Sequence, residues 1–278
     1  MAGNRPDIRL VAADLDGTLV LPDLSISPGV HGAVREATDA GVHVVLCSGR
    51  MHCCMLSYHQ ELKLRTPVIS YNGAMAWTPG EPAPFHHLPL PAPIADEIVA
   101  GALAEGLALS YFIDDTLYVP RRTRWSRLYQ ERAWAVAYEA PDLRERFQGR
   151  SPTKIILMGE PDRTEVRFRE VRARYDGVVY VTISQPEYLE FMNRECTKGT
   201  ALRRVADRLG VPMSQTMAIG DARNDTEMLQ AAAVGVAMGN ADDEVKAAAD
   251  CVAPPVADDG AAEALRRFVL GARARVSS

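Results

Sequence analysis

The chain has 278 residues, a length that favours two domains or one large domain. Hydrophobic residues make up 47% and charged residues 24% of the chain, a globular composition that excludes disorder as the main state. The formal net charge is -5, which leaves no overall basic field for a nucleic-acid backbone. We therefore expect no nucleic-acid partner, whereas a small phosphorylated substrate in a local pocket is compatible with this charge.

Neither the first residues nor the apolar stretches indicate export or membrane insertion. No apolar run long enough for a signal-peptide core follows Met1 to Asp7. No apolar stretch approaches the ~18 residues of a membrane span. We expect a soluble, cytoplasmic protein with no membrane partner.

The five cysteines form neither a disulfide framework nor paired CxxC spacings. We expect reduced and mostly buried thiols. A zinc site at His52, Cys53, Cys54 and His59 is the alternative, and it is disfavoured because adjacent cysteines on a helix point to different faces.

The predicted elements begin with strands that alternate with helices. Strands are predicted at 8–13, 42–47 and 67–71, and a helix at 27–40 ends at Gly41. Strands that are apolar on both faces and separated by helices are typical of a parallel sheet covered on both sides. We predict an α/β fold with an open, Rossmann-like parallel sheet, whose ligands lie beyond the carboxyl ends of the strands.

The pattern changes between Pro79 and Pro93, where six prolines predict a linker rather than a regular element. After it, helices are predicted at 92–105, 125–138 and 164–175, and strands at 109–113, 116–119, 154–158 and 188–192. This middle segment is predicted to form a separate α+β module.

The first rhythm resumes at Lys198, where a helix with one apolar stripe runs to Gly210. Strands are then predicted at 217–219 and 234–237. The simplest account is a discontinuous core domain, residues 1–82 and 190–278, with an α+β domain, residues 83–189, inserted into it.

Two carboxylates, Asp14 and Asp16, follow the first predicted strand, where Gly17 allows a sharp turn. An ordinary polar turn is one alternative. A calcium loop of the EF-hand type is another, but no helix precedes Asp14 and the twelfth position holds Ser25 instead of a bidentate Glu. Charge at the open rim of a sheet favours a functional pair.

Two further segments are suited to an anion. Ser48-Gly49-Arg50 follows the second strand and offers a hydroxyl and backbone N–H groups at the start of a helix. A simple Ser N-cap is the alternative. Lys198 opens the first helix after the insertion, and its position there distinguishes it from an ordinary surface lysine.

Two more carboxylates, Asp221 and Asp225, stand four residues apart where the strand at 217–219 passes into a helix. Both can face the rim that carries Asp14 and Asp16. Converging carboxylates repel one another without a cation, and a set of hard oxygen ligands suits Mg²⁺. A solvated acidic helix start is the alternative.

Taken in order, four segments resemble the motifs of the haloacid dehalogenase-like phosphatases: Asp14–Leu19, Ser48–Arg50, Lys198–Gly199 and Gly220–Asp225. The insertion between the second and third motifs is similar to the large α/β cap of the Cof-type branch. Tyr71-Asn72-Gly73-Ala74 and the segment 235–240 also fit that branch. The resemblance covers nearly the whole chain.

The resemblance implies that Asp14 is the nucleophile, forming an aspartyl-phosphate, and that Asp16 is a general acid and then a general base. It implies Mg²⁺ held by Asp14, the backbone carbonyl of Asp16, and Asp221. Asp225 is implied as a ligand through water or as a partner of the ligands. Lys198 is implied to offset the charge of Asp14 and phosphate.

The resemblance also implies that Ser48, which stands where the branch commonly has Thr, is catalytic and donates to phosphoryl oxygens. The residues expected to bind substrate are Ser48, Gly49, Arg50, Asn72, Gly73, Lys198 and Asn224. The tail at 254–260 departs from the usual pattern of the branch, which leaves its contact with the site open.

The expected function is that of a Mg²⁺-dependent phosphatase acting on a small phosphorylated metabolite, such as a sugar phosphate, a nucleotide or a cofactor phosphate. A phosphomutase is one alternative. A non-catalytic phosphate sensor is another, but such a protein should have lost Asp14, Asp16 or Lys198. The arginine- and tryptophan-rich segment 121–134 either recognises an anionic or ring-bearing leaving group or forms a solvated helix face with its aromatic residues turned inward.

Overall fold

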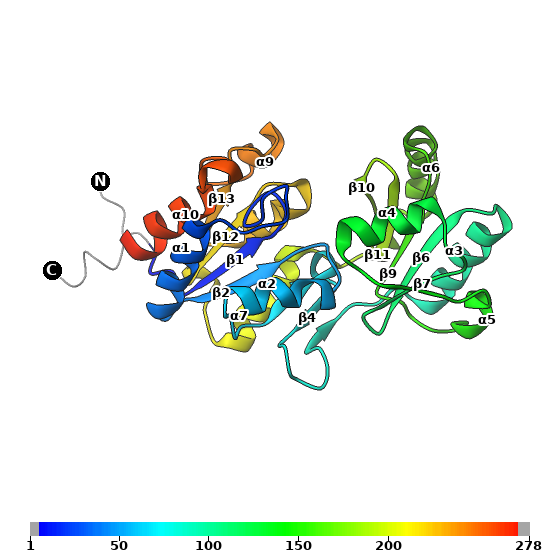
Figure 1. Cartoon of the computed structure of the whole chain (residues 1–278), viewed down its shortest axis with the longest axis horizontal. Helices are drawn as coiled ribbons and strands as arrows, with labels where there is room; N and C mark the ends of the chain where they lie inside the picture. Colours follow the sequence, from blue (N-terminus) through cyan, green and yellow to red (C-terminus); the bar gives the residue numbers. More distant parts are fainter. Residues whose placement is uncertain (1–5, 272–278) are drawn as a thin grey trace. The chain divides into compact units, whose positions relative to one another are not determined.

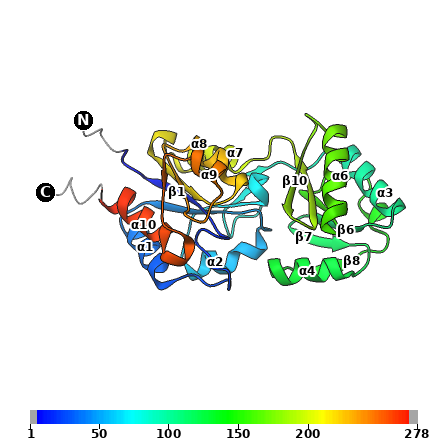
Figure 2. The same ribbon diagram turned by 90° about the horizontal axis from the view of Figure 1, so that it is seen from above.

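The computed structural model describes residues 6–271, which divide into two compact units (Figures 1 and 2). The first, here called the core unit, comprises the chain up to residue 49, residues 55–86 and the chain from residue 197 onward. The second, here called the inserted unit, comprises residues 87–196 together with residues 50–54. The expected boundaries at 82/83 and 189/190 stay a prediction, a few residues from these divisions.

The core unit is built on an eight-stranded sheet in the order β14-β13-β12-β1-β2-β3-β4-β5. Its strands are β1 (Leu10–Asp14), β2 (His43–Cys47), β3 (Val68–Ser70), β4 (Met75–Trp77), β5 (His86–His87), β12 (Thr216–Gly220), β13 (Val234–Ala237) and β14 (Cys251–Val252). The strands from β14 to β3 are parallel, and β4 runs antiparallel to β3. The predicted parallel α/β sheet is confirmed.

Helices cover both faces of this sheet, as Figure 2 shows. One face carries α1 (Pro28–Asp39), α2 (Leu56–Glu61) and α10 (Gly260–Leu265), which continues into the π-helical turn Arg266–Leu270. The other face carries α7 (Lys198–Leu209), α8 (Thr226–Ala231) and α9 (Asp243–Ala247). Alternate residues of β1 enter the two hydrophobic clusters, because successive side chains of a strand point to opposite faces.

The inserted unit is α+β, as predicted, with a six-stranded sheet in the order β10-β11-β9-β6-β7-β8. Its strands are β6 (Ala108–Ile113), β7 (Thr116–Val119), β8 (Ala137–Glu139), β9 (Lys154–Met158), β10 (Val179–Gln185) and β11 (Tyr188–Asn193), and its helices are α3 (Ala92–Ala104), α4 (Arg124–Ala133), α5 (Leu143–Arg146) and α6 (Pro161–Arg174). All neighbouring strands are antiparallel except β7 and β8. Helices α3, α5 and α6 pack on one face, and α4 covers the other through Tyr129 against Phe112.

The helix predicted at 125–138 is wrong beyond Ala133. Trp134 has the left-handed φ of 52°, which ends α4. The following residues 137–139 form β8, which pairs parallel to β7. The backbone N–H of Ala137 donates to the side chain of Gln130, which stabilises the turn after α4. The strand itself is held by its pairing with β7. Tertiary pairing overrides helix propensity here.

The arginine-rich segment takes the form of a solvated helix face. Arg124 pairs with Glu160 and stacks on the ring of Trp125, and Arg132 pairs with Glu187. These contacts with neighbouring carboxylates agree with the solvated helix face of the second interpretation, and Tyr129 is turned inward as expected, but Trp134 is 64% exposed, which contradicts an inward position for every aromatic residue.

The cysteines are all free, but the expectation that most are buried is wrong, since only Cys47 and Cys196 are buried. Within residues 6–271, the His and Cys side chains of the zinc alternative form no group that could hold a metal ion. Across the same residues, no helix combines the length and apolar character needed to cross a membrane.

A buried histidine predicts how stability depends on pH. His59 is 5% exposed, and its Nε2 lies 2.9 Å from the carbonyl oxygen of Thr66, to which it donates. Burial lowers the pKa of His59 below its usual value, although the hydrogen bond to Thr66 opposes the shift. The neutral imidazole is therefore favoured in the folded protein, and its stabilisation is present above pH ~6.5 and is lost as the pH falls below that value.

We expect the free energy of unfolding to decrease on acidification below pH ~6.5, and to decrease less in His59→Gln, which keeps an N–H donor but does not titrate. Urea unfolding of both proteins between pH 5 and pH 8 measures the difference. Identical pH profiles for the two proteins would show that His59 is not a source of the effect.

Candidate active site

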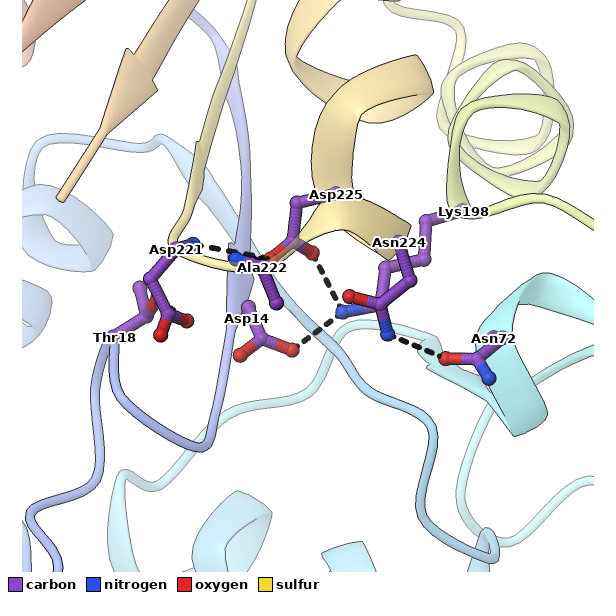
Figure 3. Close-up of polar contacts among 8 residues, drawn as sticks. All are labelled: Asp14, Thr18, Asn72, Lys198, Asp221, Ala222, Asn224 and Asp225. Atoms are coloured by element: carbon purple, nitrogen blue, oxygen red, sulfur yellow. Dashed lines mark hydrogen bonds and ion pairs between the residues drawn. The ribbon is translucent and has the colours of Figure 1, made fainter. Parts of the chain in front are cut away.

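The site lies at the carboxyl edge of the parallel strands, where four chain segments meet (Figure 3). Asp14 is the last residue of β1, Ser48 follows β2, and Asp221 follows β12. Lys198 is the first residue of α7. Parallel strands place their carboxyl ends at one edge, so residues distant in sequence converge there.

Lys198 is buried between two carboxylates. Its Nζ lies 2.5 Å from Oδ1 of Asp14 and 2.6 Å from Oδ1 of Asp225, and its side chain is 1% exposed. The helix start that carries it is fixed by Thr197, whose side chain accepts from the backbone N–H of Thr200 as an N-cap. The lysine is therefore held rigidly at the rim rather than solvated.

Asp225 uses both of its carboxylate oxygens within the protein. Oδ1 accepts from Lys198, and Oδ2 accepts from the backbone N–H groups of Asp221 and Ala222, at 3.1 and 3.0 Å. The residue is fully buried. Asp225 therefore holds the loop after β12 in shape and orients the ammonium.

Asp221 is held by residues that the sequence analysis did not single out. The hydroxyl of Thr18 donates to its Oδ1 at 3.0 Å, and Nδ2 of Asn240 lies 3.2 Å from its Oδ2. Gly17 has a φ of 81°, and a Cβ there would stand 2.3 Å from Oδ2 of Asp221, so no other residue fits without displacing that carboxylate. Thr18 and Asn240 lie inside segments that resemble the family's motifs, and this resemblance was the only sequence feature that could have indicated their role.

The tail does reach this site. The backbone N–H of Val256 donates to Oδ1 of Asn240, whose Nδ2 donates to Asp221 and to the carbonyl of Gly17. Segment 254–260 thus supports Asp221 through one intermediate side chain.

One group of carboxylates in the described chain could hold a metal ion: Asp14, Asp221 and Asp225, with one oxygen from each lying within 4.8 Å of the others. When all three are ionised they carry three negative charges, and Lys198, which contacts Asp14 and Asp225, supplies one positive charge, so this group has an excess of two negative charges in a largely buried place. The donor set of hard oxygens and the uncompensated charge both fit a divalent cation such as Mg²⁺. The side chain of Asp16 is exposed and lies outside the group.

The pKa values of these groups follow from burial and charge. Burial raises the pKa of Asp14 well above its usual range, Lys198 opposes the shift, and the other two carboxylates add to it. Burial also raises the pKa of Asp221 to about 6, reinforced by Asp225. Burial alone would lower the pKa of Lys198, but Asp14 and Asp225 outweigh it and hold that pKa well above its usual value.

The remaining predicted residues lie in two places. Ser48 is buried beside the cluster of strand ends, and Asn72 donates its backbone N–H to the Ser48 carbonyl at 3.1 Å. Nδ2 of Asn224 donates to Oδ1 of Asn72 at 2.8 Å (Figure 3). Gly49 and Gly73 belong to the same unit, whereas Arg50 groups with the inserted unit. Every predicted site residue except Arg50 thus lies in the core unit.

Comparison with known proteins places this arrangement in a family. The family model of the haloacid dehalogenase-like hydrolases matches residues 11–265 of the sequence, so the chain belongs to this family. Two Bacillus subtilis proteins are similar: phosphatase YwpJ is 29% identical, over 94% of this chain and 100% of its own length, and the 5-amino-6-(5-phospho-D-ribitylamino)uracil phosphatase YcsE is 31% identical, over 95% and 97%.

Solved structures agree with the fold. The crystal structure of TM0651 from Thermotoga maritima superposes with a TM-score of 0.85 at 31% identity, over 94% of this chain and 97% of that one. The family, its Cof-type branch and the phosphatase class inferred from the four motifs are confirmed.

Removing the buried ammonium should destabilise the core unit. In Lys198→Met, Asp14 and Asp225 lose their common cation, and breaking a buried ion pair by removing one partner costs roughly 3–5 kcal/mol. We expect a decrease of that order in the free energy of unfolding, measured by denaturant titration without divalent cations. Lys63→Met, at an exposed position of the same unit, is the control and should unfold like the wild type. A Lys198→Met protein as stable as the control contradicts the buried contacts described above.

Proposed function

We propose that the protein is a Mg²⁺-dependent phosphatase that hydrolyses a small phosphorylated metabolite through an aspartyl-phosphate on Asp14. The observation that carries the proposal is the position of Asp14, whose carboxylate ends β1 in contact with Lys198 and within one cluster with Asp221 and Asp225. Relatives similar over nearly their whole length are named as phosphatases, which supports the reaction class.

Asp14 acts as the nucleophile in the proposed reaction. Its carboxylate oxygen attacks phosphorus, and the bond between phosphorus and the leaving oxygen breaks. Asp16 gives its proton to that leaving oxygen and later takes one from the water that attacks the phosphorus of the aspartyl-phosphate. Inorganic phosphate leaves and both carboxyl groups return to their starting states. The exposed side chain of Asp16 suits a group that exchanges protons with substrate and water.

Lys198 supports the nucleophile electrostatically. A protonated ammonium beside Oδ1 favours the ionised form of Asp14, which is the form that attacks. The same ammonium is proposed to attract the phosphoryl group, whose charge is a main obstacle to attack by a carboxylate. The raised pKa of Lys198 keeps it charged through the neutral range.

The carboxylates Asp14 and Asp221, together with the backbone carbonyl of Asp16, would hold Mg²⁺. When bound, the ion neutralises negative charge on the phosphoryl group and on the carboxylates. Asp225 is proposed to act on the ligands rather than as one of them, because Lys198 and two backbone N–H groups already occupy its oxygens. A divalent cation offsets the excess of two negative charges noted above.

The phosphoryl oxygens are proposed to accept hydrogen bonds from the loop after β2 and from the loop after β12. Ser48 supplies a hydroxyl and Gly49 a backbone N–H, and Arg50 and Asn224 stay predicted substrate-binding residues. The substrate is proposed to be a sugar phosphate, a nucleotide or a cofactor phosphate, and the enzyme to act in the cytoplasm without a nucleic-acid or membrane partner.

The central test is release of phosphate from p-nitrophenyl phosphate. We expect activity that requires Mg²⁺, is lost on chelation with EDTA and returns when Mg²⁺ is added back. Asp14→Asn should reduce it to background because the nucleophile is gone. Asp23→Asn, at an exposed position of the same unit, should keep wild-type activity.

The covalent intermediate is tested separately with Asp16→Asn, which cannot assist the attacking water. Rapid quenching of this variant with substrate should reveal protein that carries one phosphoryl group by intact-mass analysis, and the group should be absent from Asp14→Asn. Full activity in Asp14→Asn rules out the assigned nucleophile.

A further inference from the structure

The turn between β3 and β4 has an unusual backbone. Tyr71, Asn72 and Gly73 have φ values of 52°, 54° and 93°, so three successive residues occupy the left-handed region. That region is sterically disfavoured for Tyr and is adopted by Asn less readily than by Gly. Tyr71 and Asn72 are also buried. A strained turn of this kind persists only where the surrounding structure holds it in place. Its contacts show which parts of the site it holds in position in return.

The first contact is with the loop after β2, which is proposed to receive the phosphoryl group. The backbone N–H of Asn72 donates to the carbonyl of Ser48 at 3.1 Å. A Cβ on Gly49 would stand 2.7 Å from Oδ1 of Asn72, so the amide of Asn72 lies directly against the Gly49 backbone. The turn therefore fixes both residues of this loop that offer donors.

The second contact is with the loop after β12. Nδ2 of Asn224 donates to Oδ1 of Asn72 at 2.8 Å, which Figure 3 shows beside Lys198. The side-chain oxygen of Asn72 is thus directed at a protein group, and it links two loops that lie 152 positions apart in sequence.

The third contact is with the start of α7. A Cβ on Gly73 would stand 2.1 Å from the carbonyl oxygen of Thr197 and 2.9 Å from the backbone nitrogen of Lys198. No side chain fits there without moving the helix start. The turn is therefore packed against the peptide that sets the direction of the Lys198 side chain.

We propose that Asn72 and Gly73 are positioning residues, which lock the Ser48–Gly49 loop, Asn224 and Lys198 into one rigid seat for the phosphoryl group. This rests on the proposed function and assigns the two residues a role other than direct contact with substrate. Displacement of catalytic groups by about 1 Å can cost on the order of 10²-fold in rate, so a rigid link between three loops has a measurable effect.

Asn72→Gly is the sharpest test, because Gly adopts the φ of 54° without strain and only the amide is lost. We expect kcat for p-nitrophenyl phosphate to fall by about 10²-fold, and the Kd of inorganic phosphate, measured calorimetrically with Mg²⁺ present, to rise. The Mg²⁺ concentration for half-maximal activity should not change, because the contacts of Asn72 described above are with Ser48, Gly49 and Asn224, which are not proposed ligands of the ion. Wild-type kcat and phosphate Kd in this variant overturn the proposal.

A double-mutant cycle shows whether Asn72 and Asn224 affect kcat through their shared hydrogen bond or independently of each other. Asn224→Ala removes the other half of the hydrogen bond, so Asn72→Gly with Asn224→Ala should reduce kcat little further than the more damaging single change. Effects on kcat that multiply instead show that Asn72 does not act through Asn224, which overturns that part of the proposal.

Lys63→Gly is the matched control, since Lys63 has the same φ of 54° at an exposed position of the same unit. Its kcat and phosphate Kd should equal those of the wild type. Gly73→Ala should lower kcat further than Asn72→Gly. A fall in thermal midpoint with unchanged kcat per folded molecule in Asn72→Gly shows a structural role only and overturns the proposal.

Failure of the proposed function gives a different pattern of results. If the wild-type protein releases no phosphate, the phosphatase proposal is wrong. The Kd of inorganic phosphate can still be compared between Asn72→Gly and Lys63→Gly, and this comparison tests the positioning role by itself. A rise in that Kd confined to Asn72→Gly supports the rigid seat whatever the reaction, and equal values overturn it.

Discussion

The structure of the core unit depends on one buried ammonium group, that of Lys198, shared between Asp14 and Asp225. Lys198 and Asp14 are 184 positions apart in sequence, and their contact requires both ends of the chain to build one sheet. Removing such charges from water is costly and is offset only when each has a close partner. The contact therefore constrains the placement of β1, α7 and the loop after β12 together.

Asp221 and Asp225 show how surroundings divide one sequence pattern into two roles. Both follow β12 and both were expected near a metal ion. Asp225 is fully buried with its oxygens occupied by Lys198 and backbone N–H groups, whereas Asp221 is less buried and contacts the side chains of Thr18 and Asn240. The two carboxylates therefore differ in their readiness to bind a cation, and spacing alone does not reveal the difference.

The sequence was informative where local pattern and topology coincide. Apolar strands followed by Asp14, Ser48 and Asp221 predicted both a parallel sheet and a common edge, because parallel strands end on one side. Thr18 and Asn240 could not be found in this way, since their role arises from contacts through space between ordinary polar residues. The same limit explains β8, where pairing with β7 overrode a helical pattern that continued past Trp134.

The close packing of the rim explains why short motifs carry so much information. Gly17 admits no Cβ against Asp221, and Gly73 admits none against Thr197, so the backbone there tolerates little change in shape. The inserted unit has a separate hydrophobic cluster that shares no residue with the two clusters of the core unit. Substitutions in its sheet and helices can therefore be accommodated without repacking the rim. A chain built in this way keeps its reactive groups fixed while most of its remaining sequence is free to vary, which is consistent with relatives that share about 30% of their residues over nearly their whole length.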